Sequence, residues 1–367
     1  MSSARHTLDM TMYELADPRA VSVLEADAAR GVRVRVLLDK DYSGSSVNQG
    51  AVSQLAGSRV QVRWAYAGEI FHQKTITVDG RTSAVMTLNL TSQYYAADRD
   101  FSVITTDQPD VAAIEHVFDT DWTGSGAPAP GPRGQDLVWS PGAATALVSL
   151  IDSAHKSLLI ENEEMDNPQI ITALQSAARR GVDVEVVMTD SSSWTDAFDE
   201  LVRAGVHVRT YSADATPYIH AKVIVADDAT LYLGSQNFST ASLDYNRELG
   251  LITTRPALVT SVYRTVQSDF AGATVFAAPA TTAPARSPSA TASCRASAVP
   301  ASDGYSGDYD IRVTSNRPDA EATASDANDH WSHRTDGSGD VVIRLWHTSP
   351  GESITVTVGG ATCSTTA

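Results

Sequence analysis

The sequence predicts an α/β protein made of two pseudosymmetric α/β/α sandwich halves with mixed sheets, followed by a small C-terminal antiparallel β-sandwich. Strands and helices are expected to alternate over residues 6–270, as they do in α/β folds. This order occurs twice, with matching residues 148 to 150 positions apart, which indicates a duplicated unit. In the last quarter of the chain, apolar and polar residues alternate with the period of two that is typical of β-strands.

These patterns divide the chain into four segments. The expected segments are a first half at residues 1–123, a second half at 135–272, a linker at 273–292 and a β-sandwich module at 293–367. The linker is almost wholly Ala, Pro, Thr and Ser, a composition that cannot pack a core. The second half starts with an extra strand and helix over Leu137–His155. We therefore expect the natural protein to begin upstream, with a leading helix and a signal peptide.

The elements of the first half are predicted from end signals and periodicity. Asp17 and Pro18 supply the N-cap and the first-turn proline of a helix over Arg19–Arg30, which ends at Gly31. An Asp-Gly pair is a strong turn signal and predicts a hairpin. The other expected elements are strands over His6–Glu14, Val32–Leu38 and Val60–Trp64, a loop over Ser43–Gly50, and a hairpin of Phe71–Val78 and Thr82–Leu88 through Asp79-Gly80.

The second half repeats the order of the first. Its expected strands are Leu158–Glu163, Val182–Met188, Val206–Thr210, Tyr218–Ala226 and Leu231–Ser235, and its expected helices are Pro168–Arg180 and Thr195–Ala204. In the module, we expect strands over Asp310–Thr314, Asp340–Trp346 and Ser353–Val358. The alternation in the module predicts an antiparallel sandwich with one buried face on each sheet.

Composition narrows the classes of function. The chain is 42% hydrophobic, as globular proteins are, and no stretch approaches the roughly 20 apolar residues that a membrane span needs. A net charge of −17 weighs against sequence-independent binding of nucleic acid. The two cysteines, Cys294 and Cys363, bracket the module. They predict one disulfide and a secreted or cell-surface protein, with two free thiols as the alternative.

A His-x-Lys-x4-Asp pattern occurs twice, 148 residues apart. On a strand, a histidine and a lysine two positions apart project to one face. If the two strands meet at the pseudo-twofold axis, two imidazoles and two ammonium groups surround one point. One imidazole can then attack a phosphodiester, the other can protonate the leaving oxygen and activate water, and the lysines can stabilise the phosphoryl oxygens. The predicted catalytic residues are His72, Lys74, His220 and Lys222.

Carboxylates follow each histidine at two spacings. Asp79 and Asp227 end the two motifs, and we interpret them as structural residues that cap turn amides. Asp100 and Glu248 each lie 28 residues after a histidine. A carboxylate that accepts a hydrogen bond from one imidazole nitrogen fixes the tautomer and leaves the other nitrogen free for chemistry. The alternative for this second pair is a surface ion pair with the arginine that precedes each carboxylate.

Amide side chains also occur in matched positions. Asn89 and Asn237 each lie 17 residues after a histidine and can donate to a phosphoryl oxygen. Thr87 and Ser235, two residues earlier in each half, are predicted to contact the substrate. A polar turn residue is the alternative for the asparagines.

These motifs resemble those of the phospholipase D superfamily over roughly residues 6–270. The second half carries the Gly-Ser-x-Asn element at Gly234–Asn237, whereas Met86 replaces the glycine of the first half. The resemblance implies attack by His72 and acid/base catalysis by His220, although the near symmetry of the sequence leaves this open. A histidine nucleophile needs no metal or cofactor, so we expect activity in chelator.

The resemblance implies hydrolysis or transfer of phospholipid headgroups through a phosphohistidine, with peripheral contact to a membrane surface. The alternatives are a nuclease of the same fold and a binding protein that keeps the motifs without turnover. One chain is expected to suffice for the active site. Glutamates at strand ends are expected to be solvated, with a place at the border of a cleft as the alternative; they are Glu14, Glu161, Glu163 and Glu164. Aromatic residues of the module are candidates for a glycan or cell-surface ligand, with core packing as the alternative; they are Tyr305, Tyr309, Trp331 and Trp346.

Overall fold

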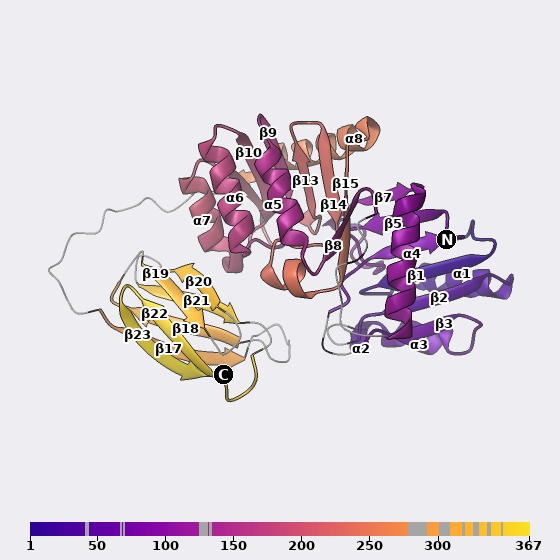
Figure 1. Ribbon diagram of the computed structural model, residues 1–367, viewed down its shortest axis with the longest axis horizontal. Coiled ribbons are helices and arrows are strands. Elements are labelled where there is room, and N and C mark those ends of the chain that lie inside the picture. The colour runs from indigo at the N-terminus through magenta and orange to yellow at the C-terminus, as the bar shows by residue number, and fades with distance from the viewer. Residues whose placement is uncertain are drawn as a thin grey trace. The chain divides into compact units, whose positions relative to one another are not determined.

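The chain folds into two compact units, Met1–Ala278 and Pro279–Ala367 (Figure 1). The computed structural model describes residues 1–40, 44–66, 68, 70–124, 131, 134–277, 292–300, 309–317, 320–325, 330–335, 339–345 and 348–367. Most of the predicted linker therefore lies outside the described residues. The first unit is built on two mixed sheets covered by helices, and the described part of the second unit consists of antiparallel sheets. The predicted fold class is confirmed.

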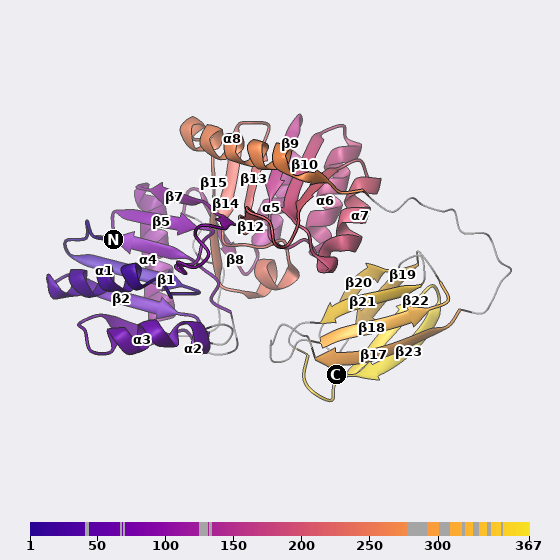
Figure 2. The same cartoon turned by 180° about the vertical axis from the view of Figure 1, so that it is seen from behind.

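The sheet of the first half has the strand order β3-β2-β1-β4-β5-β7. Strands β1, β2 and β3 are parallel, and the remaining pairs are antiparallel. Apolar side chains of β1 such as Leu8 and Met10 pack against α1 and α3, whereas α4 covers the opposite face (Figures 1 and 2). The elements are β1 (Thr7–Met12), α1 (Pro18–Ala29), β2 (Arg33–Leu38), α2 (Gly44–Val47), α3 (Gln49–Leu55), β3 (Gln61–Trp64), β4 (Thr75–Val78), β5 (Thr82–Met86), β7 (Ser102–Thr105) and α4 (Gln108–Thr123).

The sheet of the second half has the strand order β16-β11-β10-β9-β13-β14-β15-β8. Side chains on one face pack with α5 and α6 in one core, and those on the other face pack with α8 in another, which Figure 2 shows from the α8 side. The elements are β8 (Leu137–Ser140), α5 (Ala143–Ser153), β9 (Ser157–Glu161), α6 (Pro168–Arg179), β10 (Asp183–Thr189), a 3₁₀ turn (Ser192–Trp194), α7 (Thr195–Arg203), β11 (His207–Tyr211), β13 (Val223–Ala226), β14 (Thr230–Gly234), a π-helical turn (Ala241–Tyr245), β15 (Glu248–Thr253), α8 (Pro256–Gly272) and β16 (Thr274–Val275).

The two halves are joined by backbone pairing and by a shared core. Strand β6 (Asp98–Arg99) of the first half pairs in parallel with β12 (Tyr218–Ile219) of the second. One apolar cluster includes Ile114 from α4 together with Leu233 and Leu249 from the second sheet. The halves therefore form a single unit, in agreement with the clustering of their contacts. No helix in the described part of the chain is long and apolar enough to cross a bilayer.

Local signals predicted some elements well and others poorly. Helix α1 begins as expected, because the Asp17 side chain accepts a hydrogen bond from the Arg19 amide. The prediction of a loop over Ser43–Gly50 is wrong, since α2 and α3 occupy most of that range. The buried Asn48 stabilises this region by accepting a hydrogen bond from the Leu15 amide at 2.6 Å and donating to the Tyr13 carbonyl at 2.8 Å. These long-range contacts cannot be seen in a local pattern.

The described residues of the second unit form one three-stranded and one four-stranded antiparallel sheet, with orders β17-β18-β21 and β20-β19-β22-β23. The predicted disulfide between Cys294 and Cys363 is present and joins the first and last strands. Tyr309 packs against the module's core. Tyr305, Trp346 and the side chain of Trp331 lie outside the described residues, so the glycan platform stays a prediction. The strands are β17 (Cys294–Pro300), β18 (Tyr309–Ser315), β19 (Glu321–Ser325), β20 (His330–Arg334), β21 (Asp340–Leu345), β22 (Ser353–Val358) and β23 (Ala361–Thr366).

The two motif aspartates fasten neighbouring strands together. The Asp79 carboxylate accepts hydrogen bonds from the backbone amides of Arg5, His6 and Thr7, and Asp227 does the same for residues 155–157. We expected these aspartates to cap their own turns, whereas they bind the amides that precede the adjacent strand. Burial alone would raise the pKa of Asp79, but the three amide donors outweigh it and lower the pKa. The role is structural.

Replacing Asp79 by Ala is expected to lower the free energy of unfolding by about 1 kcal/mol, because backbone donors lose their acceptor. Asp79→Asn should cost less, since it keeps one acceptor oxygen. A carboxylate whose pKa is lowered by folding contributes stability above its ordinary pKa of 3.8, and this is lost as the pH falls further. Urea unfolding should therefore show the deficit at pH 7 and a smaller one at pH 3. An equal deficit at both pH values would contradict this role.

Candidate active site

Both His-x-Lys segments lie just before a strand of their sheet, next to a segment of the opposite half. Sequence reasoning placed His72 and Lys74 on a strand, but β4 begins at Thr75. The Gln73 amide donates to the Arg247 carbonyl, and the Arg247 amide donates to the Ile70 carbonyl, both at 2.9 Å. The second motif mirrors this arrangement, because β12 pairs with β6 immediately before His220. The segment that precedes or contains each motif is thus held by backbone hydrogen bonds to the opposite half.

This exchange pairs each imidazole with a carboxylate from the opposite half. His72 Nδ1 lies 2.8 Å from Glu248 Oε2, and His220 Nδ1 lies 2.8 Å from Asp100 Oδ1. The 28-residue spacing linked each histidine to the carboxylate of its own half, so the residues were predicted but the crossing was not. With the carboxylates ionised, Nδ1 of each ring is suited to donate to its carboxylate, which leaves Nε2 for other contacts.

The paired imidazoles and several hydrogen bonds favour the ionised form of both carboxylates. Burial alone would raise the pKa values of Asp100 and Glu248, but the imidazoles and neighbouring donors outweigh it and lower both. The Thr87 hydroxyl donates to Asp100, and the Ser242 hydroxyl donates to Glu248. Thr87 was predicted to contact the substrate, yet its hydroxyl proton is already donated to Asp100. Ser235 is likewise buried and accepts a hydrogen bond from the Leu249 amide.

The arginines that precede these carboxylates form a second crossed layer. Arg99 pairs with Asp269 at the end of α8, and Arg247 pairs with Asp121 near the end of α4. The alternative in which each arginine pairs with its adjacent acidic residue is therefore not found. Both ion pairs join one half to the other, so they hold the exchanged segments in register.

The two motif lysines are fully buried beside their histidines. Lys74 Nζ donates to the His72 carbonyl at 2.7 Å, and Lys222 Nζ donates to the His220 carbonyl. The Lys74 ammonium also lies 4.9 Å from the centre of the Tyr13 ring. Burial lowers the pKa of Lys74 to about 7. The charges of both lysines lower the pKa of His72, although Lys222 belongs to the opposite half.

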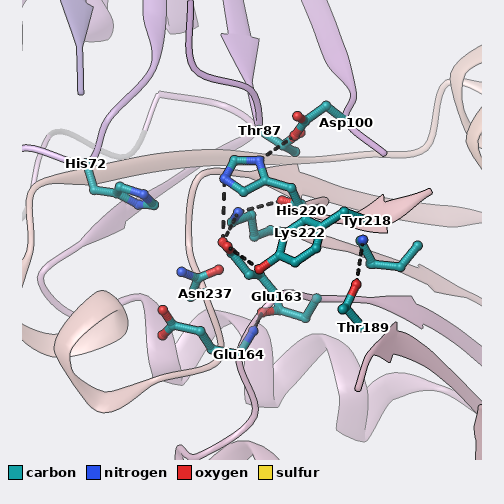
Figure 3. A network of polar contacts seen from close by, with 12 residues as sticks. His72, Thr87, Asp100, Glu163, Glu164, Thr189, Tyr218, His220, Lys222 and Asn237 are labelled. Atoms are coloured by element: carbon teal, nitrogen blue, oxygen red, sulfur yellow. Dashed lines mark hydrogen bonds and ion pairs between the residues drawn. The ribbon is translucent and has the colours of Figure 1, made fainter. Parts of the chain in front are cut away.

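Glu163 is a member of the site that sequence reasoning placed at a solvated strand end. Its Oε2 lies 2.8 Å from Lys222 Nζ and 3.5 Å from His220 Nε2, and its Oε1 accepts a hydrogen bond from the Tyr218 hydroxyl at 3.2 Å (Figure 3). Burial alone would raise the pKa of Glu163, but Lys222 and His220 outweigh it and lower it well below its usual range. The carboxylate is therefore ionised. Local periodicity offers no signal for this placement.

Asp98 is a further acidic residue that sequence reasoning missed. Burial raises its pKa to about 6. Among the described residues, Asp98, Asp100 and His220 form a group whose ligand atoms lie within 4.8 Å of one another, close enough to hold a cation. Sequence spacing had indicated no such cluster beyond the motif histidines.

The two asparagines retain unused hydrogen-bonding capacity. Asn237 is buried, and in the described part of the chain its Oδ1 has no hydrogen-bond partner; the same holds for Asn89 Oδ1. Figure 3 shows Asn237 near His72 and Glu163. A carboxamide whose polar atoms are not satisfied within the protein is suited to bind a ligand.

The first half lacks the motif glycine without losing the local backbone. A Cβ at Gly234 would lie 2.4 Å from the Gly250 Cα, so this strand pair requires glycine there. In the first half, Met86 pairs with Ser102, and the Met86 amide still donates to the Lys74 carbonyl at 3.1 Å. The Gly234 amide makes the matching bond to Lys222. Met86 is therefore accommodated by packing.

The fold and this site define a phospholipase D-like protein. The family model described as "Cardiolipin synthase, PLD-like domain" matches residues 1–122 and 147–270, more than half of the chain. The chain therefore belongs to the phospholipase D superfamily, and the match covers both of its halves.

Relatives and solved structures agree with this assignment. The chain is 27% identical over 315 residues to cardiolipin synthase A of Pseudomonas entomophila (strain L48), covering 74% of this chain and 64% of that protein. It is 33% identical over 122 residues to the mitochondrial cardiolipin hydrolase of Xenopus tropicalis, covering 32% of this chain and 56% of that protein. The chain thus matches less than two thirds of the length of these relatives. Phosphatidylserine synthase of Haemophilus influenzae Rd KW20 shares the fold, with a TM-score of 0.59 and 12% identity over 75% of this chain and 83% of that one.

We expect the His72 imidazole to titrate near pH 4, because burial lowers its pKa to about 4 against the opposing charge of Glu248. Nitrogen chemical shifts of the imidazoles measure this directly. Glu248→Gln should lower the midpoint further, since it removes the charge that favours the imidazolium. The matched Asp100→Asn variant should leave the titration of His72 unchanged. The opposite result would show that the carboxylates act within their own halves.

Proposed function

We propose that the chain cleaves or transfers phospholipid headgroups through a covalent phosphohistidine on His72. The observation that carries the proposal is the crossed pairing of His72 with Glu248 and of His220 with Asp100 at 2.8 Å. Because each carboxylate binds Nδ1, the Nε2 atoms of both imidazoles are available to a substrate, in a site that also contains both lysines. Such a site supplies a nucleophile, a proton donor and cationic stabilisation to a single phosphodiester.

The chemistry takes two steps in this site. His72 Nε2 forms a bond to phosphorus while the P–O bond to the leaving alcohol breaks, and the leaving oxygen takes the proton from His220 Nε2. Water or an acceptor alcohol then loses a proton to His220 as its oxygen bonds to phosphorus, and the N–P bond to His72 breaks. Hydrolysis and headgroup transfer differ only in this second oxygen nucleophile. Lys74 and Lys222 are placed to stabilise the phosphoryl oxygens.

Three observations support a lipid substrate. The relatives named above are cardiolipin synthases and a cardiolipin hydrolase. The net charge of −17 opposes the approach of polyanions. Tyr94 and Tyr95, which are 43% and 46% exposed, lie between Asn89 and Asp98 in the chain, and tyrosine suits the interface of a bilayer. We therefore also propose peripheral contact with a membrane surface.

Secretion or display at the cell surface is part of the proposal, and its support is the Cys294–Cys363 disulfide. A nuclease of the same fold is the second candidate and has no separate observation in its favour. A binding protein without turnover fits less well, because both His–Lys pairs and both orienting carboxylates are in place.

The substrate class is tested by incubating the purified chain with vesicles of phosphatidylcholine or phosphatidylglycerol and, separately, with single-stranded DNA, each with a chelator. We expect released headgroup, or transferred phosphatidyl product when an alcohol is added, and no DNA cleavage. DNA cleavage without headgroup release would replace the lipid proposal with the nuclease.

The covalent step is tested with bis(p-nitrophenyl) phosphate, whose leaving group needs little protonation. His220→Ala should still release a burst of nitrophenol and accumulate phosphohistidine, while its steady-state rate falls about 10²- to 10⁴-fold for lack of a base. His72→Ala should give neither burst nor label. Mapping the label after acid-free quenching identifies the modified ring, and a label on His220 in the unmodified chain would contradict attack by His72.

A further inference from the structure

The pseudo-twofold axis equates Tyr13 with Glu163, and these two side chains have different chemistry. Their equivalence is structural, since the bridge Leu15–Leu90 in the first half matches Met165–Phe238 in the second. Around the two imidazoles, the lysines, asparagines and orienting carboxylates all have counterparts of the same type. At this position the first half places a neutral aromatic ring where the second half places a carboxylate.

In the first half, Tyr13 packs against the nucleophile proposed above. Its ring lies edge-on to the His72 ring, with the two centres 4.7 Å apart and an angle of 76° between the planes. Within the described residues, the only ion-pair partner of the His72 ring is Glu248, which is bound to Nδ1. No carboxylate in that set is therefore paired with His72 Nε2, whose lone pair is left for attack.

In the second half, Glu163 faces the reactive nitrogen of the other imidazole. Asp100 holds His220 Nδ1, and Glu163 Oε2 lies 3.5 Å from His220 Nε2. A nearby carboxylate favours the protonated imidazole, with its second proton on Nε2. Glu163 is kept ionised and in place by Lys222 at 2.8 Å and by the Tyr218 hydroxyl at 3.2 Å.

We propose that Glu163 is the positioning residue that keeps the transferable proton on His220 Nε2 and thereby leaves attack to His72. This inference rests on the phosphohistidine chemistry proposed above, but not on the lipid substrate. Glu163 acts through His220, which gives its proton to the leaving oxygen and recovers one from the incoming water or alcohol. The number of protons is the same before and after each turnover.

The charge environment of His220 fixes the sign of the expected pH effect. The titratable groups that face it are Asp98, Asp100, Glu163, Tyr218 and Lys222. Glu163→Gln removes the negative charge that lies 3.5 Å from His220 Nε2. Because the rate falls when a general acid deprotonates, the basic limb of kcat/KM should move to lower pH.

Glu163→Gln is the conservative test, because a carboxamide oxygen can still accept from Lys222 or Tyr218. Glu25→Gln is the matched control, since Glu25 lies on α1 and accepts a hydrogen bond from the Gln54 side chain, away from both histidines. Both variants lose one negative charge. Only Glu163→Gln is expected to change how the rate depends on the leaving group. Circular dichroism and thermal unfolding verify that both variants are folded.

The rates are measured on aryl methyl phosphodiesters whose leaving groups run from p-nitrophenol to phenol. A p-nitrophenolate leaves without a proton, so Glu163→Gln should retain its rate within about threefold, whereas the rate with phenol should fall about 10- to 100-fold. The Glu25→Gln control should have the same rate as the unmodified chain with every leaving group. Phosphohistidine should map to His72 in all three proteins.

The outcomes separate this inference from the proposed function. An equal loss with every phenol, or an unmoved basic limb, would overturn the role of Glu163 and leave the phosphohistidine mechanism standing. Activity on aryl diesters without headgroup release from vesicles would reject only the lipid substrate. A chain that forms no phosphohistidine on any diester would reject the mechanism itself.

Discussion

The exchange of short segments between the two halves is the constraint on which the site depends. Each His-x-Lys segment is held by backbone contacts to the other half, so His72 meets Glu248 and His220 meets Asp100. A half on its own would have an imidazole without its orienting carboxylate and a buried lysine without its full set of neighbours. The crossed ion pairs of Arg99 and Arg247 and the apolar core shared by both halves keep the exchange in place.

The same exchange makes it possible to bury so many charges. Lys74, Lys222 and Glu248 are fully buried, and an isolated ion in such a place would be strongly disfavoured. Here cations and anions alternate, and hydrogen bonds from Thr87 and Ser242 satisfy the carboxylates further. Because water is largely excluded, each remaining charge acts more strongly on a bound phosphodiester than it would in solvent. Packing and catalysis thus draw on one arrangement.

The sequence was sufficient to predict features that depend on local signals or on the repeat. Asp17 and Pro18 predicted the start of α1, and the doubled motif predicted which histidines and lysines converge. The crossed pairing could not be derived, because Asp100 and Glu248 have the same spacing whether they serve their own half or the other. Glu163 was missed because a glutamate after a strand is solvated unless a distant segment covers it, as the segment of Tyr218 does here. Asn48 escaped for the same reason: its partners, Leu15 and Tyr13, are more than thirty residues away.

A duplicated site has a difficulty that a single-copy site does not have, because symmetry gives both imidazoles the same surroundings whereas the reaction needs one nucleophile and one acid. The ion pairs that join the two halves can remain symmetric, as the Arg99–Asp269 and Arg247–Asp121 pairs do. Division of labour then requires only a difference at the reactive nitrogens. Tyr13 and Glu163 supply a difference there that leaves the strands and their register alone. A single change of side chain beside Nε2 can therefore separate the roles of two rings that the fold makes geometrically equivalent.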